Sequence, residues 1–194
     1  MLDSKNKNEI KKILHNDGII AFATDTVWGL GCDAGSERAV KRIYEIKHRD
    51  TNKPLILMSD EIYPLLKYVK PFSKTVHRLI KTHFPGALTL VLPKSGLTPD
   101  YITSGMDTVG IRVPDNRSFA EICLCAPSRV LATTSANPSF EPPALTYDTA
   151  VYYFKNSVDC IVPDCGNPVK GIVSTVAAVC GDDIKILRQG EIII

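Results

Sequence analysis

The sequence predicts one α/β domain, residues 1–194, built on a twisted, mixed β-sheet with flanking helices. Short apolar segments typical of strands alternate with segments whose apolar residues recur at helical spacing. Successive strand-like segments are not separated by one helix each, which favours a mixed sheet over a purely parallel one. The 44% hydrophobic and 23% charged residues are those of an ordinary globular domain.

The N-terminal part contains two predicted helices with a strand between them. Apolar residues recur at helical spacing over 7–16, and the continuous apolar run over 18–23 predicts a buried strand. Ser36 suits the N-cap of a second helix, whose residues 39–46 present one apolar face. This helix ends on basic residues, which are favoured at a helix C-terminus.

The remainder alternates between strands and helices in the same way. Strands are predicted over 55–58, 87–92, 108–113, 130–134, 160–162, 172–179 and 184–188. Helices are predicted over 60–69, 73–84, 118–125 and 146–154. The Pro- and Gly-rich segments 93–105 and 138–143 are expected to be loops at the edge of a ligand site.

Composition narrows the class of protein. The net charge of +2 is too small to argue nucleic-acid binding by itself. Six cysteines follow a polar N-terminus without a signal peptide, so we expect reduced, mostly buried thiols in a cytoplasmic protein, in preference to a zinc site. No apolar run approaches the roughly 20 residues of a membrane span, so no membrane association is expected.

Several common catalytic motifs are missing. There is no G-x-x-x-x-G-K-[ST] phosphate loop, no G-x-G-x-x-G after a strand and no G-x-S-x-G elbow. The four histidines are scattered, and no metal ligands are predicted. The chemistry must therefore come from residues outside these patterns.

A group of cations follows the second helix. Lys47, Arg49 and Lys53 could clamp a polyphosphate, with Arg as a fork and Lys as a point charge. The alternative is a solvated helix end, which is common for an isolated Lys-x-Arg. The apolar run that begins at Pro54 argues for the clamp, because it places these cations beside the core.

Polar residues also interrupt or end the predicted strands. Arg112 stands inside an apolar strand and needs a ligand anion or an internal carboxylate, and these two alternatives are about equal. Arg188 ends another strand. The turn at 24–26 and the segment 133–137 bring hydroxyl groups to strand ends, and Ser174 stands inside the predicted strand 172–179. Each alone is more often a capped turn or a β-favouring threonine, and spacing alone predicts a glycine-rich bend after 24–26.

Taken together, these segments resemble the YrdC/TsaC family of threonylcarbamoyl-AMP synthases in its short form. The resemblance runs from Gly18 to Gly190 and rests on motifs in a fixed order. These are T-D-T-V-x-G-L-G, K-x-R followed by K-P-L, G-x-R-V-P, S-A-N, S-T-V and L-R-Q-G. Each motif is weak alone, and the set is specific.

The resemblance implies a fold and a reaction. The fold is a twisted α/β sheet with a basic concave cleft. The reaction joins L-threonine, bicarbonate and ATP, with Mg²⁺, into threonylcarbamoyl-adenylate and pyrophosphate. A partner complex, the tRNA-modifying threonylcarbamoyl transferase, then passes the threonylcarbamoyl group to an adenosine beside the tRNA anticodon.

The resemblance also assigns residues to the two substrates. Thr26, Arg112 and Ser174 would contact L-threonine. The ATP contacts would be Arg49, Lys53, Thr108, Ser135, Asn137 and Arg188. Lys47 and Arg49 would act on the phosphates in catalysis.

The chain departs from the family pattern at four positions. Ala23 replaces a frequent proline, and Trp28 keeps an aromatic wall where tyrosine or phenylalanine is usual. Met58 stands where longer members often have a histidine near threonine, and Pro143 where a serine often contacts ATP. The resemblance therefore assigns no substrate contact to either of these two positions.

Two other functions compete with this one. A non-catalytic module could bind tRNA or double-stranded RNA through phosphate contacts in the cleft, and direct RNA contact is also compatible with the enzyme. A carbamoyl-adenylate enzyme with a different acceptor is the third hypothesis.

Overall fold

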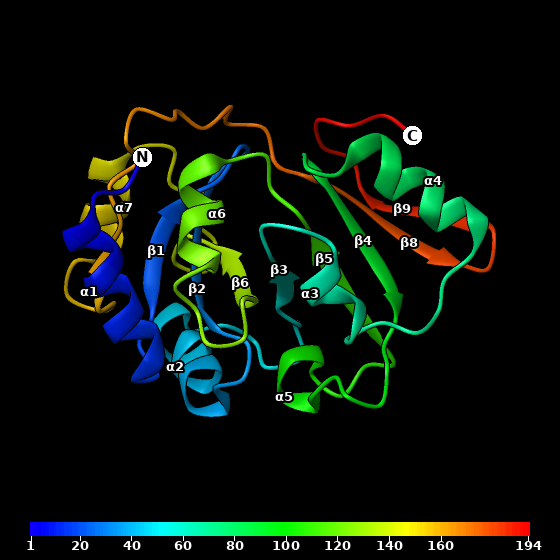
Figure 1. Ribbon diagram of the computed structural model, residues 1–194, viewed down its shortest axis with the longest axis horizontal. Helices are drawn as coiled ribbons and strands as arrows, with labels where there is room; N and C mark the ends of the chain where they lie inside the picture. Colours follow the sequence, from blue (N-terminus) through cyan, green and yellow to red (C-terminus); the bar gives the residue numbers. More distant parts are fainter.

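The computed structural model describes residues 1–194 and contains one nine-stranded mixed sheet with helices packed on both faces (Figure 1). The strands are β1 Ile20–Ala23, β2 Trp28–Asp33, β3 Ile56–Met58, β4 Leu88–Pro93, β5 Thr108–Arg112, β6 Leu131–Ser135, β7 Cys160–Ile161, β8 Thr175–Cys180 and β9 Asp183–Arg188. The helices are α1 Ser4–His15, α2 Glu37–Lys47, α3 Tyr63–Leu66, α4 Lys74–His83, α5 Asp100–Thr103, α6 Arg117–Cys123 and α7 Tyr147–Phe154.

The strand order is β7-β1-β2-β6-β3-β5-β4-β8-β9. Pairings are mixed: β3 runs parallel to β5 and antiparallel to β6, and β4 runs parallel to β8. The predicted mixed α/β sheet is confirmed. The segment between β7 and β8 connects the two ends of the sheet and runs along the upper edge of the molecule in Figure 1.

The two faces of the sheet have different chemistry. One face carries apolar side chains in register across the strands, from Cys32 and Ala132 through Leu57 and Ile111 to Leu90, and it packs on α2 and α4. We call the opposite face the site face. Part of it is covered by α1 and α6, whose apolar side chains cluster with Phe22 and Met58.

Glycines shape the site face beside this apolar cluster. Gly29 lies opposite Phe22 in the pairing of β1 with β2. A Cβ atom at Gly29 or Gly31 would stand 3.0–3.1 Å from the Phe22 ring, so the ring occupies the space that side chains there would need. The glycines of the T-D-T-V-x-G-L-G motif therefore let an aromatic ring lie across β2.

Several predicted elements need correction. The segment after the polar turn is not a glycine-rich bend but the interior strand β2, whose glycines pack against Phe22. The helix predicted over 60–69 shrinks to α3, which is only four residues long. The loop at 93–105 contains the short helix α5, and β8 begins at Thr175, so Ser174 precedes the strand.

The predicted capping of α2 is confirmed, since the Ser36 hydroxyl accepts a hydrogen bond from the Ala39 N–H at 3.1 Å. His48 follows the helix in the left-handed conformation, with φ of 47°. That turn sends the chain from Lys47, which is buried, back toward the sheet at Arg49.

None of the seven helices has the length and apolar character needed to span a membrane.

Candidate functional site

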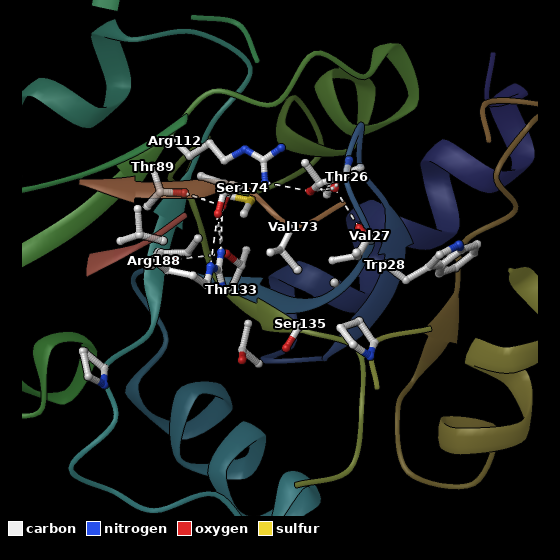
Figure 2. Close-up of a pocket in the computed structure, with 18 of the residues that line it drawn as sticks. Thr26, Val27, Trp28, Thr89, Arg112, Thr133, Ser135, Val173, Ser174 and Arg188 are labelled. Carbon is white, nitrogen blue, oxygen red and sulfur yellow. Dashed lines mark hydrogen bonds between the residues drawn. The ribbon is translucent and has the colours of Figure 1, made fainter. Parts of the chain in front are cut away.

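A cavity of about 230 Å³ opens on the site face (Figure 2). Its walls come from β2 to β6, β8 and β9, from the turn after β1 and from the segments before β3, after β6 and before β8. In Figure 2 the side chains of Arg112, Thr26, Ser174 and Arg188 surround one common space. Residues distant in sequence therefore meet here because their strands are neighbours in the sheet.

The turn Thr24-Asp25-Thr26 is folded by its own hydroxyl groups. The Thr24 hydroxyl donates to the Val27 carbonyl at 2.7 Å and accepts from the Thr26 N–H at 3.1 Å. Because the single proton of Thr24 is used, the 3.0 Å contact between the two hydroxyls has Thr26 as its donor. Thr26 Oγ1 also accepts from Arg112 at 2.9 Å, so it keeps one lone pair for a ligand.

Arg112 is buried, with 2% of its surface exposed. Its Nε–H donates to the Gly86 carbonyl at 2.9 Å, one Nη donates to Thr26 and the other to Asp25 Oδ1 at 2.5 Å. Burial lowers the pKa of Arg112, and the neighbouring Asp25 carboxylate opposes that change. Three of the five guanidinium N–H groups are used, which leaves two for an anion in the cavity.

Arg188 is held at the opposite wall. Its Nε and one Nη donate to the Ser174 carbonyl at 3.1 and 2.8 Å, and the same Nη contacts the Ser174 hydroxyl at 3.0 Å. Burial lowers the pKa of Arg188, and the positive charge of Arg112 lowers it further. Two guanidinium groups thus face one cavity, an arrangement that favours an anionic ligand.

A second cavity, of about 270 Å³, adjoins the first and shares Arg49 and Ser135 with it. Lys47, Lys53 and Asn137 also line it. Arg49 donates from Nε to the Lys53 carbonyl and from one Nη to the Pro54 carbonyl, both at 3.1 Å. The other Nη carries two free N–H groups, and burial lowers the pKa of this guanidinium.

Lys47 is buried and has three oxygen partners. Its ammonium group donates to the Ser135 carbonyl, to Asn137 Oδ1 at 3.2 Å and to the Thr134 hydroxyl at 3.4 Å. These contacts join the end of α2 to the loop after β6. Lys47 also lines the second cavity, and its predicted action on phosphates stays a prediction.

The cations of the two cavities mostly lack carboxylate partners. Arg112 pairs with Asp25. No Asp or Glu oxygen lies within 4.0 Å of Lys47, Arg49, Lys53 or Arg188, although ion pairs occur elsewhere on the protein. An excess of positive charge beside two connected cavities suits a ligand with several negative charges.

Most of the predicted site residues come together. The first cavity is lined by Thr26, Arg49, Arg112, Ser135, Ser174 and Arg188, and the second by Lys47, Arg49, Lys53, Ser135 and Asn137. Thr108 is the exception. It begins β5 opposite Pro93 and lines neither cavity. Strand alternation puts it on the face of Arg112 but at the far end of the strand, so the structure does not place it at the site.

Three departures from the family pattern, Trp28, Met58 and Pro143, and one missed residue also line the first cavity. Met58 and Pro143 contribute apolar walls where the family pattern often has polar side chains. Thr89, which the sequence analysis did not single out, lies in β4 and contacts the Ser174 hydroxyl at 2.9 Å. The sequence feature that could have identified Thr89 is its polar side chain inside the apolar run Leu88–Pro93. The wider basic concave cleft stays a prediction.

The fold and the site together define a class: mixed α/β proteins whose sheet carries an arginine-lined cavity for small anionic ligands. The chain belongs to the Sua5/YciO/YrdC family, since the family model described as "Telomere recombination" matches residues 12–190. This agrees with the resemblance that the sequence motifs indicate.

Individual relatives support this membership. The threonylcarbamoyl-AMP synthase of Pyrococcus abyssi is 37% identical over 172 residues, which are 89% of this chain and 50% of the relative. That of Halorhodospira halophila is 36% identical over 77% of this chain and 78% of the relative. The chain thus spans half the length of the first relative and most of the second.

A solved structure extends the likeness to three dimensions. The crystal structure of P. abyssi Sua5 complexed with L-threonine aligns with a TM-score of 0.91 and 33% identity. The alignment covers 98% of this chain and 55% of that one. The single sheet and its connections are therefore those of a Sua5 protein's corresponding part.

Proposed function

We propose that this protein is a threonylcarbamoyl-AMP synthase. One observation carries the proposal: two cavities meet at Arg49 and Ser135, one with free hydrogen-bonding groups on Arg112 and Thr26 and the other with unpaired cations. The first suits an amino acid and the second a polyphosphate. The family membership and the names of the relatives support the same reaction.

The amino-acid end is the part of the first cavity around Arg112 and Thr26. Two free N–H groups on a buried guanidinium suit a carboxylate, which binds Arg in a planar fork. The remaining lone pair of Thr26 Oγ1 can accept a hydrogen bond from the amino acid. The P. abyssi relative was solved in complex with L-threonine, which supports an amino acid as one ligand of this chain.

The nucleotide end begins at Arg49, where the cavities join. The free Nη of Arg49, the ammonium group of Lys53 and the free Nη of Arg188 can all donate to phosphate oxygens. Lys47 contributes positive charge from behind the Ser135–Asn137 loop. Because these cations are already in position before the reaction starts, they stabilise the charge that develops on the departing pyrophosphate.

The chemistry needs no protein nucleophile. The amine of L-threonine and bicarbonate form a carbamate with loss of water. A carbamate oxygen then attacks the α-phosphorus of ATP, the bond to the β-phosphate oxygen breaks, and pyrophosphate leaves. The protein's contribution is to hold the two substrates in line and to keep water from the labile carbamate.

Mg²⁺ would enter with ATP as part of the substrate. Proteins usually hold Mg²⁺ through one or two carboxylates together with substrate phosphates. Asp50 is the one carboxylate residue that lines the cavities, and no group of three or more metal-binding side chains exists in the structure. These residues fit an ion carried by the triphosphate and do not fit a resident metal.

The product points to a downstream partner. A threonylcarbamoyl-adenylate is an activated acyl donor, so a transferase must consume it, and we infer the enzyme that modifies adenosine beside the anticodon of tRNA. Six free cysteines support a reducing compartment such as the cytoplasm. Direct contact between this chain and tRNA is part of the same proposal and is tested separately.

The experiment measures pyrophosphate release from ATP and Mg²⁺ with and without L-threonine and bicarbonate. We expect release only when both are present, together with a product that has the mass of threonylcarbamoyl-AMP. No threonine-dependent release would overturn the proposal. Equal rates with other amino acids would instead favour a carbamoyl-adenylate enzyme with another acceptor, and salt-sensitive RNA binding without ATP affinity would favour an RNA-binding module.

A further inference from the structure

Thr89 is a polar residue in the interior of the sheet. It lies in β4, between Leu88 and Leu90, and none of its surface is exposed to solvent. Its strand pairs with β8, where Leu88 stands opposite Thr175 and Thr89 opposite Val176. This register places its side chain on the site face, next to Ser174, where it lines the first cavity.

The Thr89 hydroxyl has a single hydrogen-bond partner in the protein. That partner is the Ser174 hydroxyl, with 2.9 Å between Oγ1 and Oγ (Figure 2). Distance alone does not decide which of the two oxygens is the donor. The exposure of the two residues favours one of them, since Thr89 is fully buried and Ser174 keeps 4% of its surface exposed.

If Ser174 donated to Thr89, the proton of Thr89 would have no acceptor in the protein. A buried hydroxyl without a partner for its proton costs free energy, on the order of 1–3 kcal/mol. If Thr89 donates instead, its proton is satisfied, and the unpaired proton is that of Ser174, which keeps 4% of its surface exposed and can reach a ligand in the cavity. Ser174 Oγ then accepts from Thr89 and from Arg188, at 3.0 Å, and its own proton is free.

We propose that Thr89 is a positioning residue for the amino-acid substrate: it fixes the Ser174 hydroxyl as a donor that points into the first cavity, toward an oxygen of the bound amino acid. This inference rests on the proposed function, because it concerns the substrate of the same site. Thr89 acts through Ser174, and it does not itself bind the substrate.

The arrangement makes Ser174 complementary to Thr26. Thr26 Oγ1 is an acceptor with one free lone pair, whereas Ser174 Oγ is left with a free proton. An amino acid between them therefore meets one acceptor and one donor. Arg188 is held by the carbonyl and hydroxyl oxygens of Ser174, so the same contacts fix the nucleotide end of the cavity as well.

The test compares T89V, T89S, S174A and the double variant T89V/S174A. Valine keeps the shape of threonine and removes the hydroxyl. In T89V we expect the KM for L-threonine to rise about tenfold, which is the effect of one hydrogen bond, with the KM for ATP within about twofold of the parent protein. T89S should restore the KM for L-threonine.

The double variant shows whether Thr89 acts through Ser174. If it does, T89V/S174A should have the same KM for L-threonine as S174A alone, because the hydroxyl that Thr89 orients is gone. The matched control is T98V. Thr98 is also a buried threonine whose hydroxyl donates within the protein, to the Tyr68 carbonyl, and it lines neither cavity. T98V should lower stability and leave the KM for L-threonine unchanged.

Three results would overturn the inference: an unchanged KM in T89V, equal defects in T89V and T89S, or a further loss when T89V is added to S174A. If the parent protein releases no pyrophosphate with any amino acid, the proposed function is wrong, and the role of Thr89 is then measured without the reaction. Calorimetric titration of L-threonine into the parent protein, T89V and S174A then measures the positioning role directly. Equal affinities would count against it.

Discussion

Asp25 Oδ1 lies 2.5 Å from an Nη of Arg112, and both side chains are almost fully buried. This pair resolves the two alternatives that the sequence left open for Arg112. The guanidinium has an internal carboxylate, and it also has N–H groups free for a ligand. The carboxylate neutralises the cation when the cavity holds no anion, so the site can be built before a substrate arrives.

The first prediction concerns this pair. D25N keeps the shape of the side chain and removes its charge, which leaves Arg112 buried without a counter-charge. The free energy of unfolding should fall by about 3 kcal/mol, as when one partner of a buried ion pair is removed. Denaturant unfolding measures it. The control D100N removes the charge of an exposed partner of Lys94 and should cost less than about 1 kcal/mol.

The second prediction concerns the cations where the cavities join. R49A and K53A should each lower kcat/KM for ATP by about tenfold or more, because each loses a charge-assisted contact to phosphate. Steady-state pyrophosphate release measures this. K41A is the control: Lys41 is exposed on the same stretch of chain and pairs with Glu37 within α2. Near-normal activity in both R49A and K53A would place the phosphates elsewhere.

The third prediction follows from the burial of Lys47. Burial, helped by the positive charge of Arg49, lowers the pKa of Lys47 from 10.5 to about 7. Between these values the folded protein binds fewer protons at Lys47 than the unfolded chain does, so the free energy of unfolding should rise with pH across this window. The stability that the folded protein gains from the neutral form of Lys47 is therefore lost as the pH falls from 10.5 to about 7.

Polyphosphate binding should raise the lowered pKa of Lys47 again. Negative charge beside Lys47 favours its ammonium form, so ATP binding near pH 8 should take up protons. Calorimetric titrations in buffers of different ionisation enthalpy measure that uptake. K47M should abolish it. An uptake that persists in K47M would assign the proton to another group.

Local sequence patterns predict much of the fold and most of the site. Helix α2, its Ser36 cap and the cations after it follow from local spacing, so they were predictable. Strand β2 was not, because its glycines resemble a loop until Phe22 is placed across them by pairing of β1 with β2. The hydrogen bonds of Lys47 were also hidden, since its three partners lie far along the chain and reach it through the sheet.

The same limit explains why the sequence analysis did not single out Thr89 and why it included Thr108 among the site residues. Both are threonines in predicted strands, and local sequence cannot say which one faces a cavity. The pairing of β4 with β8 brings Thr89 to Ser174, whereas Thr108 starts its strand opposite Pro93. Strand order is a property of the whole sheet, so single residues within strands are assigned reliably only once the neighbours are known.

The last prediction tests the packing that shapes β2. In G31A the new methyl group would stand 3.0 Å from both the Phe22 ring and the Thr133 methyl group. The strand is paired with β1 on one side and β6 on the other and cannot move aside, so overpacking should lower the free energy of unfolding by about 1–3 kcal/mol. Adding F22L removes ring atoms and should restore part of that loss. The control is G96A, since nothing lies within 4 Å of a Cβ atom at Gly96 and its φ is not positive. Thermal and denaturant unfolding of the three variants measure these effects. A G31A protein as stable as G96A would show that Phe22 does not fix the glycine at this position.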